Sequence, residues 1–331
     1  MWSSRKLGYV AVAVVLVLCS SLLLGARADA SRQEPRPVLR GQVFGDPSVV
    51  TTRLGSVVVS TGPRVLRGAL RRGGRHWHWR SAALVRVPRW ARQGAVWGPD
   101  LAHVTRHRWV LYFAAQVRGL GGSAHCIGAA VARSPYGRFH PVDRRPLVCQ
   151  AGARAPRAWD QLRPRRMPRR GVIDPSYFRD RRGHGYLVYK TSGRPSSIRL
   201  LPLAHGGLGR RRHSHSVRLV RSRGIIENPM LVGHHGRYYL LTSEGDWSGC
   251  GYHETWRASR HLGRWSGRAH ELLTRRSTHG VCGPGGADIA GRRGHKKVYF
   301  HGWVRGGRRA MYAARLAWRH GRPVIHGYAR R

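Results

Sequence analysis

Five short segments of the chain carry an acidic residue in a similar local pattern, although only 14 of the 331 residues are Asp or Glu. Three of them place the acid next to Pro or Asn-Pro: GDPSVV with Asp46, IDPSYF with Asp174 and IENPMLV with Glu227. The other two are WGPDLAHV with Asp100 and GPGGADIA with Asp288. Such carboxyl groups can serve as general acid and general base if the fold brings them together. The alternative is that they cap turns, as Asp before Pro or Ser often does.

A β-rich run follows each acidic segment. The runs are SVVVS, WVLYFA, YLVYKT, YYLLTS and KVYFHG at residues 56–60, 109–114, 186–191, 238–243 and 297–302. Each acid precedes the start of the core of its run by 10 to 12 residues, and successive cores are 52 to 76 residues apart. Five repeats of such a hairpin unit predict an all-β fold, a five-bladed β-propeller. The longest step contains two insertions, the 126–149 segment and the Arg-rich stretch 151–170.

The predicted fold gives the acids a common place. The blades of a propeller are arranged radially, so the innermost strand of each blade lines one central channel. If the acid occupies the same place in every unit, the five acids meet at one end of that channel. We therefore expect the candidate site there.

The order of these motifs resembles glycoside hydrolase family 43. GDPSVV, IDPSYF and IENPMLV occur in that order within the blade-like units, and WGPDLAHV followed by RWVLYFAA resembles the second-blade segment of the family. CIGAAVARSPYGRF, and VYFHGW followed by RRAMYAARLAW, resemble further family segments, so the likeness covers residues 40–320. It implies a five-bladed β-propeller that cleaves arabinose- or xylose-containing polysaccharide by inversion. We favour an α-L-arabinofuranosidase or arabinanase over a β-xylosidase.

The resemblance also implies roles for three acids. Asp46 matches the general base, Glu227 the general acid, and Asp174 the third carboxylate, which orients the acid and modulates its pKa. Inversion requires one carboxyl group to protonate the leaving oxygen and another to deprotonate a water on the opposite face of the sugar. Acids from different blades can leave room for that water. Because the net charge of +47 favours ionised carboxylates, we expect Asp174 to oppose this field by like-charge repulsion.

Several residues beside the motifs are candidates for substrate binding, because aromatic rings stack against the apolar faces of sugars. For any one of the 12 Trp residues, a place in the core is the alternative. The resemblance further suggests that Arg308 or Arg309 pairs with a catalytic carboxylate. The substrate-binding candidates are Phe44, Trp97, Asp100, Trp247, His301 and Trp303.

Two positions depart from the family pattern. Many members carry His after the Gly-Pro-Gly of the last blade, where it helps to hold a central cation, but this chain has Gly286 there. We therefore expect no required cofactor and no metal ligands, and a structural Ca²⁺ ion in the channel is doubtful. Asn228 follows Glu227 where a small residue is more usual, and we expect it to disturb the surroundings of the acid.

The N-terminus has the order of an export signal. Arg5 and Lys6 precede an apolar run over residues 7–24, and small residues follow at 26–30. This pattern predicts a Sec-type signal peptide over 1–30 and a single secreted domain over 31–331. The alternative is an uncleaved segment that anchors the chain in a membrane.

Export would leave four cysteines, an even number in an oxidising compartment. Two disulfides are expected, and three connectivities are possible. We favour the sequential pairs Cys126–Cys149 and Cys250–Cys282, because they close short loops. Metal binding by these cysteines is disfavoured because no Cys-x-x-Cys pair occurs.

The basic excess of 61 Lys and Arg comprises only four Lys. The Arg residues spread over the whole chain, which is typical of a bias in coding composition. We therefore expect no specific nucleic-acid partner, no membrane partner after signal cleavage, and a monomer acting on plant-type polysaccharide or oligosaccharide. The alternative function is a non-catalytic propeller that binds polysaccharide or polyanions, and polyanion binding would weaken steeply with salt.

Overall fold

The protein is described here by a computed structural model over residues 34–40, 44–117, 124–142, 145–150, 160–162, 171–292 and 294–329. The expected signal peptide, residues 1–30, lies outside the described residues, as does most of the Arg-rich stretch 151–170. Within the described ranges the regular secondary structure consists of strands. None of these residues belongs to a helix long and apolar enough to cross a membrane.

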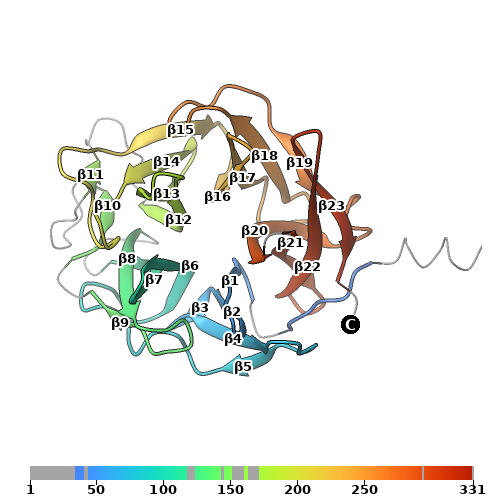
Figure 1. The fold of residues 1–331 in the computed structure, drawn as a ribbon, viewed down its shortest axis with the longest axis horizontal. Helices are drawn as coiled ribbons and strands as arrows, with labels where there is room; N and C mark the ends of the chain where they lie inside the picture. The colour runs from blue at the N-terminus through green and yellow to red at the C-terminus, as the bar shows by residue number, and fades with distance from the viewer. Residues whose placement is uncertain are drawn as a thin grey trace, which may run out of the picture.

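The strands form five sheets arranged around a central axis (Figure 1). Blade I contains β1 (Ser48–Thr51), β2 (Gly55–Ser60), β4 (Leu66–Arg71) and β5 (His78–Arg80). Blade II contains β6 (Ala95–Thr105), β7 (Arg108–Gln116), β8 (His125–Ala132) and β10 (Val148–Gln150), extended by β3 (Gly62–Pro63), β9 (His140–Pro141) and β11 (Asp160–Leu162).

The remaining blades have four strands each. Blade III contains β12 (Val172–Arg179), β13 (Gly185–Thr191), β14 (Ser196–Pro202) and β15 (Val217–Ser222). Blade IV contains β16 (Ile226–His234), β17 (Arg237–Glu244), β18 (His253–Ser259) and β19 (His270–Leu273). Blade V contains β20 (Cys282–Arg292), β21 (His295–Val304), β22 (Arg308–Arg319) and β23 (Arg322–Tyr328).

This arrangement confirms the predicted five-bladed β-propeller. The acidic segments form or directly precede the innermost strands β1, β6, β12, β16 and β20. The five β-rich runs are the second strands β2, β7, β13, β17 and β21, each antiparallel to the innermost strand of its blade. Of the additional strands of blade II, β9 lies within the 126–149 insertion and β11 within the 151–170 stretch, whereas β3 comes from the segment after β2.

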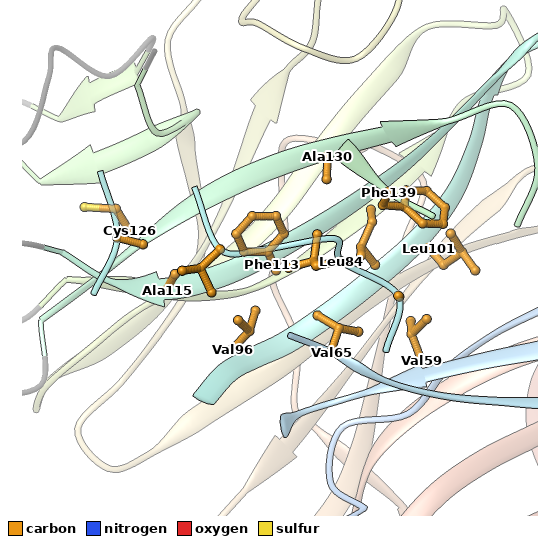
Figure 2. Packing of buried hydrophobic residues seen from close by; sticks show 14 of the residues in the cluster. Val59, Val65, Leu84, Val96, Leu101, Phe113, Ala115, Cys126, Ala130 and Phe139 are labelled. Atoms are coloured by element: carbon orange, nitrogen blue, oxygen red, sulfur yellow. The ribbon is translucent and has the colours of Figure 1, made fainter. Parts of the chain in front are cut away.

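The second strands are apolar along most of their length because both faces of each blade are buried. Successive side chains of a strand point to opposite faces, so Val57 and Val59 pack towards blade II while Val58 packs towards blade V. Five hydrophobic clusters result, one at each junction between neighbouring blades. Figure 2 shows part of the cluster between blades I and II, with Phe113 and Leu84 among its labelled residues.

The ring is closed by the segment before β1. Val38 N–H donates to Met311 O at 2.8 Å, Met311 N–H donates to Leu39 O at 3.0 Å, and Phe44 N–H donates to Arg309 O at 3.1 Å. The N-terminal segment therefore runs along β22 of the last blade before the chain enters the first.

The two favoured disulfides are confirmed. Cys126 pairs with Cys149 within blade II, and Cys250 pairs with Cys282 between blades IV and V. The second disulfide ties the loop that carries Trp247 to the start of the innermost strand β20.

Candidate active site

Three consecutive residues from each innermost strand, or from the turn that leads into it, line a narrow central cavity of about 40 Å³. A cavity of this size holds at most a few water molecules. The lining residues are 46–48, 98–100, 174–176, 228–230 and 286–288.

The first residue of each triplet adopts a left-handed backbone conformation. The φ angles are 53° at Asp46 and Asp174, 47° at Gly98, 46° at Asn228 and 61° at Gly286. Asp, Asn and Gly tolerate this region better than other residues. A Cβ atom on Gly98 would lie 2.6 Å from Asp174 Oδ1, which shows how closely the blades approach at this point.

These five residues define the true repeat, and the acids are not equivalent within it. Asp46 and Asp174 occupy the left-handed position, and Glu227 lies one residue before it. Asp100 and Asp288 lie two residues after it, further along their strands. The expectation that all five acids share one place is therefore wrong. They form a mouth set of Asp46, Asp174 and Glu227 and a channel pair of Asp100 and Asp288.

Two side chains fix the carboxyl group of Asp46. Thr61 Oγ1 donates to Oδ2 at 2.7 Å, and Asn228 Nδ2 donates to Oδ1 at 3.1 Å. The backbone N–H of Asp46 donates to Nδ1 of His301 at 3.0 Å. The carboxyl group thus comes from blade I, and its partners come from blades I, IV and V.

Glu227 is buried and also held by two side chains. Lys190 Nζ lies 2.5 Å from Oε2, and the Tyr252 hydroxyl donates to Oε1 at 2.8 Å. Tyr252 in turn accepts a hydrogen bond from Asn228 Nδ2 at 3.0 Å. Asp174, also buried, accepts the backbone N–H of Asn228 at 3.1 Å. Asn228 therefore links all three acids. We expected Asn228 to disturb the surroundings of Glu227, but it connects Glu227, through Tyr252, to the other two acids.

The surroundings shift the pKa values of Asp46 and Asp174 in opposite directions. Burial and the charge of Glu227 together raise the pKa of Asp174 to about 8, against the opposing charge of Lys190. Burial would also raise the pKa of Asp46, but the charge of Arg309 and the hydrogen bonds from Thr61 and Asn228 bring it below the usual value. At neutral pH, Asp46 is therefore a carboxylate, whereas the Asp174–Glu227 pair retains a proton. Carboxyl groups with separated pKa values can divide the roles of base and acid.

The channel pair has a different environment. Asp100 accepts hydrogen bonds from Ser48 Oγ at 3.1 Å and from the Tyr177 N–H at 2.8 Å. Asp288 accepts the N–H groups of Val49 and Ile289. Both acids connect neighbouring blades and have their oxygens occupied. The carboxyl group of Asp100, predicted to bind substrate, thus joins three blades in this structure.

Two of the predicted aromatic residues are exposed beside the mouth set. Trp97 is 37% exposed and stacks on His125 with ring centroids 4.0 Å apart. It occupies on blade II the position of Glu227 on blade IV, directly before the left-handed residue. Trp247 is 50% exposed, and its carbonyl oxygen accepts a hydrogen bond from Trp303 Nε1 at 3.1 Å.

Of the two arginines predicted to pair with a catalytic carboxylate, Arg309 lies beside the mouth set. Its guanidinium group lies over the ring of Trp303, 4.6 Å from the centroid, and Nη2 donates to Trp247 O at 3.0 Å. Its charge is one of the causes that lower the pKa of Asp46. Arg308 is exposed on the surface.

Two predicted substrate-binding residues are wrong because their side chains are completely buried. Phe44 packs in the cluster between blades V and I. Its ring meets that of Trp79 in an edge-on arrangement, with the ring centroids 5.5 Å apart. His301 lies beneath Asp46, where burial lowers its pKa to about 3, so its neutral ring accepts the N–H of Asp46. Phe44 is a core residue, and His301 supports the backbone of Asp46.

Neither Tyr252 nor Lys190 was predicted from the sequence to be a site residue. Burial and the charge of Glu227 raise the pKa of Tyr252 well above its ordinary value, so its hydroxyl group remains a donor. No motif surrounds Tyr252 that could have singled it out. Lys190 did carry a signal, because it is one of only four Lys residues in an Arg-rich chain.

A metal ion is not suggested by the described residues, among which no group of three or more His, Cys, Asp or Glu side chains converges as ligands. Ca²⁺ prefers several oxygen ligands, whereas the carboxyl oxygens of Asp100 and Asp288 already accept hydrogen bonds. These residues do not fit a Ca²⁺ site.

Comparison with known proteins gives a family match over most of the chain. The sequence model described as glycosyl hydrolases family 43 matches residues 36–323. None of the curated proteins compared with the chain matches it.

Solved structures of that family share the fold at low sequence identity. A thermostable family-43 glycoside hydrolase superposes with a TM-score of 0.73 at 17% identity, covering 90% of this chain and 97% of the other. The α-L-arabinanase of Cellvibrio cellulosa, complexed with arabinohexaose, gives 0.67 at 19%, covering 86% and 96%. An endo-1,4-β-xylanase from Bacteroides thetaiotaomicron gives 0.66 at 18%, covering 88% and 97%.

Proposed function

The chain belongs to glycosyl hydrolases family 43, and we propose that this glycoside hydrolase cleaves arabinose-containing polysaccharide or oligosaccharide by inversion. Xylose-containing substrates are the second choice within the same mechanism. The observation that carries the proposal is the mouth set: three carboxyl groups from three blades, linked through Asn228 and Tyr252.

Asp46 is proposed as the general base. Its pKa lies below the usual value, so it is ionised at neutral pH and can accept a proton from water. Thr61 and Asn228 orient the carboxylate, and the left-handed turn at Asp46 directs it to the mouth, where its side chain is 17% exposed. Partial exposure matters because the attacking water must reach this oxygen.

Glu227 is proposed as the general acid and Asp174 as its partner. In inversion, the acid protonates the glycosidic oxygen while the base removes a proton from water on the opposite face of the sugar. The raised pKa of Asp174, about 8, keeps a proton on the Asp174–Glu227 pair at neutral pH. Because the two groups are coupled, the proton belongs to the pair and not to either residue alone.

Exposed aromatic rings support a sugar substrate. Trp97 and Trp247 are on the surface near the mouth set, although large aromatic residues are more often covered. An arabinan-type substrate is favoured because an α-L-arabinanase with bound arabinohexaose is among the structures of similar fold. The identity of 19% to that enzyme leaves the choice of sugar as a proposal.

We further propose that the enzyme is exported and acts as a monomer without a required cofactor. The signal pattern over residues 1–30 supports export. The disulfides Cys126–Cys149 and Cys250–Cys282 agree with an oxidising compartment. The alternative is an uncleaved N-terminal anchor. Sequencing the N-terminus of the exported protein would distinguish it from a cleaved signal peptide.

The Glu227→Gln variant tests this function. Release of 4-nitrophenol from the α-L-arabinofuranoside and the β-D-xyloside, and of reducing ends from arabinan, should fall by about 10²–10⁴-fold. The loss should be larger on arabinan, because its leaving group needs protonation more than 4-nitrophenolate does. Glu271→Gln is the matched control, since Glu271 is exposed on the outermost strand β19.

The outcomes separate the candidate functions. Activity in the wild type and the control, but not in Glu227→Gln, supports the hydrolase and selects the sugar. Full activity in Glu227→Gln would contradict the role of Glu227. A folded wild-type protein without activity on all three substrates would favour the non-catalytic propeller, for which salt-sensitive binding would indicate a polyanion.

A further inference from the structure

One position on the second strand recurs in all five blades. It lies opposite the residue that precedes the left-handed turn, as the pairs Trp97–Ala114, Ile173–Lys190, Glu227–Ser243 and Gly285–His301 show. In blade I, Thr61 takes this place, and its N–H donates to Gly45 O at 3.1 Å. The position is therefore occupied by Thr61, Ala114, Lys190, Ser243 and His301.

In three blades this position provides a hydrogen-bond acceptor for the next blade. Thr61 Oγ1 accepts the N–H of Gly98 at 3.0 Å, and Ser243 Oγ accepts the N–H of Gly286 at 2.8 Å. His301 Nδ1 accepts the N–H of Asp46 at 3.0 Å. In each case the donor is the left-handed residue of the following blade, so the common task of the position is to join blades.

Lys190 cannot perform this task, because an ammonium group donates hydrogen bonds and accepts none. At this junction the N–H of the left-handed residue Asn228 goes to Asp174 Oδ2 instead, at 3.1 Å. Lys190 Nζ contacts Glu227 Oε2 at 2.5 Å, with both side chains about nine-tenths buried. The position that joins blades elsewhere thus presents a buried cation to the proposed acid.

The choice of Lys here runs against the composition of the chain. Only four of the 61 Lys and Arg residues are Lys. The other three are Lys6, in the expected signal peptide, and the exposed pair Lys296 and Lys297. A compact ammonium group fits a single carboxylate oxygen, whereas the planar guanidinium group of Arg needs more space and more partners. The contact of Lys190 with a single carboxylate oxygen therefore favours Lys over Arg at this position.

Other charged and titratable groups also face the Glu227–Asp174 pair. Asp46, Asp174 and Tyr252 surround Glu227 from blade I, blade III and the loop before β18. His301, whose ring is neutral, and Arg309 lie beyond Asp46 on blade V. Among the described residues, Lys190 forms the salt bridge to Glu227. Its charge is the one best placed to favour the ionised state of the pair.

We propose that Lys190 is a positioning residue for Glu227, which orients the carboxyl group and sets the highest pH at which the Glu227–Asp174 pair keeps its catalytic proton. This inference rests on the proposed function, in which the pair supplies the acid. A cation in contact with a carboxyl group stabilises the ionised form. Lys190 therefore lowers the pH at which acid catalysis is lost.

The test compares pH profiles of kcat/KM on the preferred substrate. Lys190→Met should move the basic limb to higher pH by about one to two units, since removal of the cation favours the protonated pair. The acid limb should stay in place, because Lys190 does not contact Asp46. Lys190→Arg keeps the charge and should leave the basic limb near its wild-type position. Lys297→Met is the matched control, an identical loss of charge at an exposed site.

A second neutral variant protects the test against misfolding. Lys190→Thr introduces the side chain that blade I carries at the same position and should shift the basic limb in the same direction. An unmoved basic limb in both neutral variants would overturn the proposal, as would a failure of both to fold while Lys190→Arg folds. Failure of the proposed function would be recognised separately, as activity retained in Glu227→Gln.

Discussion

The mouth set and the channel pair are carboxyl groups on different innermost strands or on the turns that lead into them, and different partners hold them. In the mouth set, Asp46 and Glu227 each receive two side-chain hydrogen bonds. In the channel pair, Asp100 and Asp288 receive mainly backbone N–H groups from their own or neighbouring blades. When positions are counted from the left-handed residue of each blade, the two sets differ by only two or three residues.

This difference separates a chemical from a structural use of the same residue type. A backbone donor is fixed by the sheet, so a carboxylate bound to it stabilises the packing of the blades. Side-chain donors such as Lys190 and Tyr252 can be chosen individually, and they determine the charge and orientation of the carboxyl group. Substitution should therefore affect activity in the mouth set and stability in the channel pair.

The largest expected effect in this comparison is that of Asp174→Asn. The variant removes the group that shares a proton with Glu227, so kcat/KM should fall by about 10²-fold or more. The basic limb of its pH profile should move to lower pH, because a negative charge that opposes ionisation of the pair is lost. The measurement is the pH dependence of kcat/KM. An unchanged profile would contradict the role of Asp174.

Substitution in the channel pair should change the free energy of unfolding rather than the activity. Burial, with a contribution from Asp288, raises the pKa of Asp100 to about 7, against 3.8 for a free side chain. The folded state therefore binds a proton more tightly than the unfolded state, and the stabilisation it provides below pH 4 is lost as the pH rises through 7. In Asp100→Asn this group no longer titrates, so the free energy of unfolding should decrease less between pH 4 and pH 8.

Urea unfolding of both proteins across this pH range measures the effect. Asp100→Asn should cost about 1 kcal/mol at pH 4, where one amide hydrogen atom meets a site built for an acceptor. The cost should shrink or reverse at pH 8. Its kcat/KM should stay within about threefold of the wild type. Parallel pH curves for the two proteins, or a loss of activity like that of Asp174→Asn, would remove the distinction between the two sets.

The sequence allowed the fold to be predicted because the blades repeat locally. Every second strand is apolar on both faces, and every innermost strand begins with a turn that needs Asp, Asn or Gly. The two disulfides were likewise predictable from short loops. The acids misled the alignment of the repeat because the turn residue is Gly in blades II and V, and an acid two positions later took its place in the pattern.

The remainder of the site depends on contacts between blades, which local sequence does not encode. His301 supports Asp46 across 255 residues of sequence, and Lys190 reaches Glu227 across 37. Phe44 resembled a substrate-binding ring because it precedes Asp46, but the closure of the propeller buries it against blade V. Register between strands, rather than distance along the chain, decides which side chains meet at the mouth.

The smallest expected effect concerns the aromatic rim of the mouth. Trp247→Ala should raise KM by roughly tenfold and leave kcat and both limbs of the pH profile nearly unchanged, because stacking on an exposed ring contributes on the order of 1–2 kcal/mol. Trp79→Ala is the matched control, since Trp79 is 41% exposed but lies on the outermost strand of blade I. Steady-state kinetics on an arabinan oligosaccharide would measure both. Equal changes in the two variants would show that Trp247 acts on stability, and a shifted pH profile would show that it acts through Arg309 on Asp46.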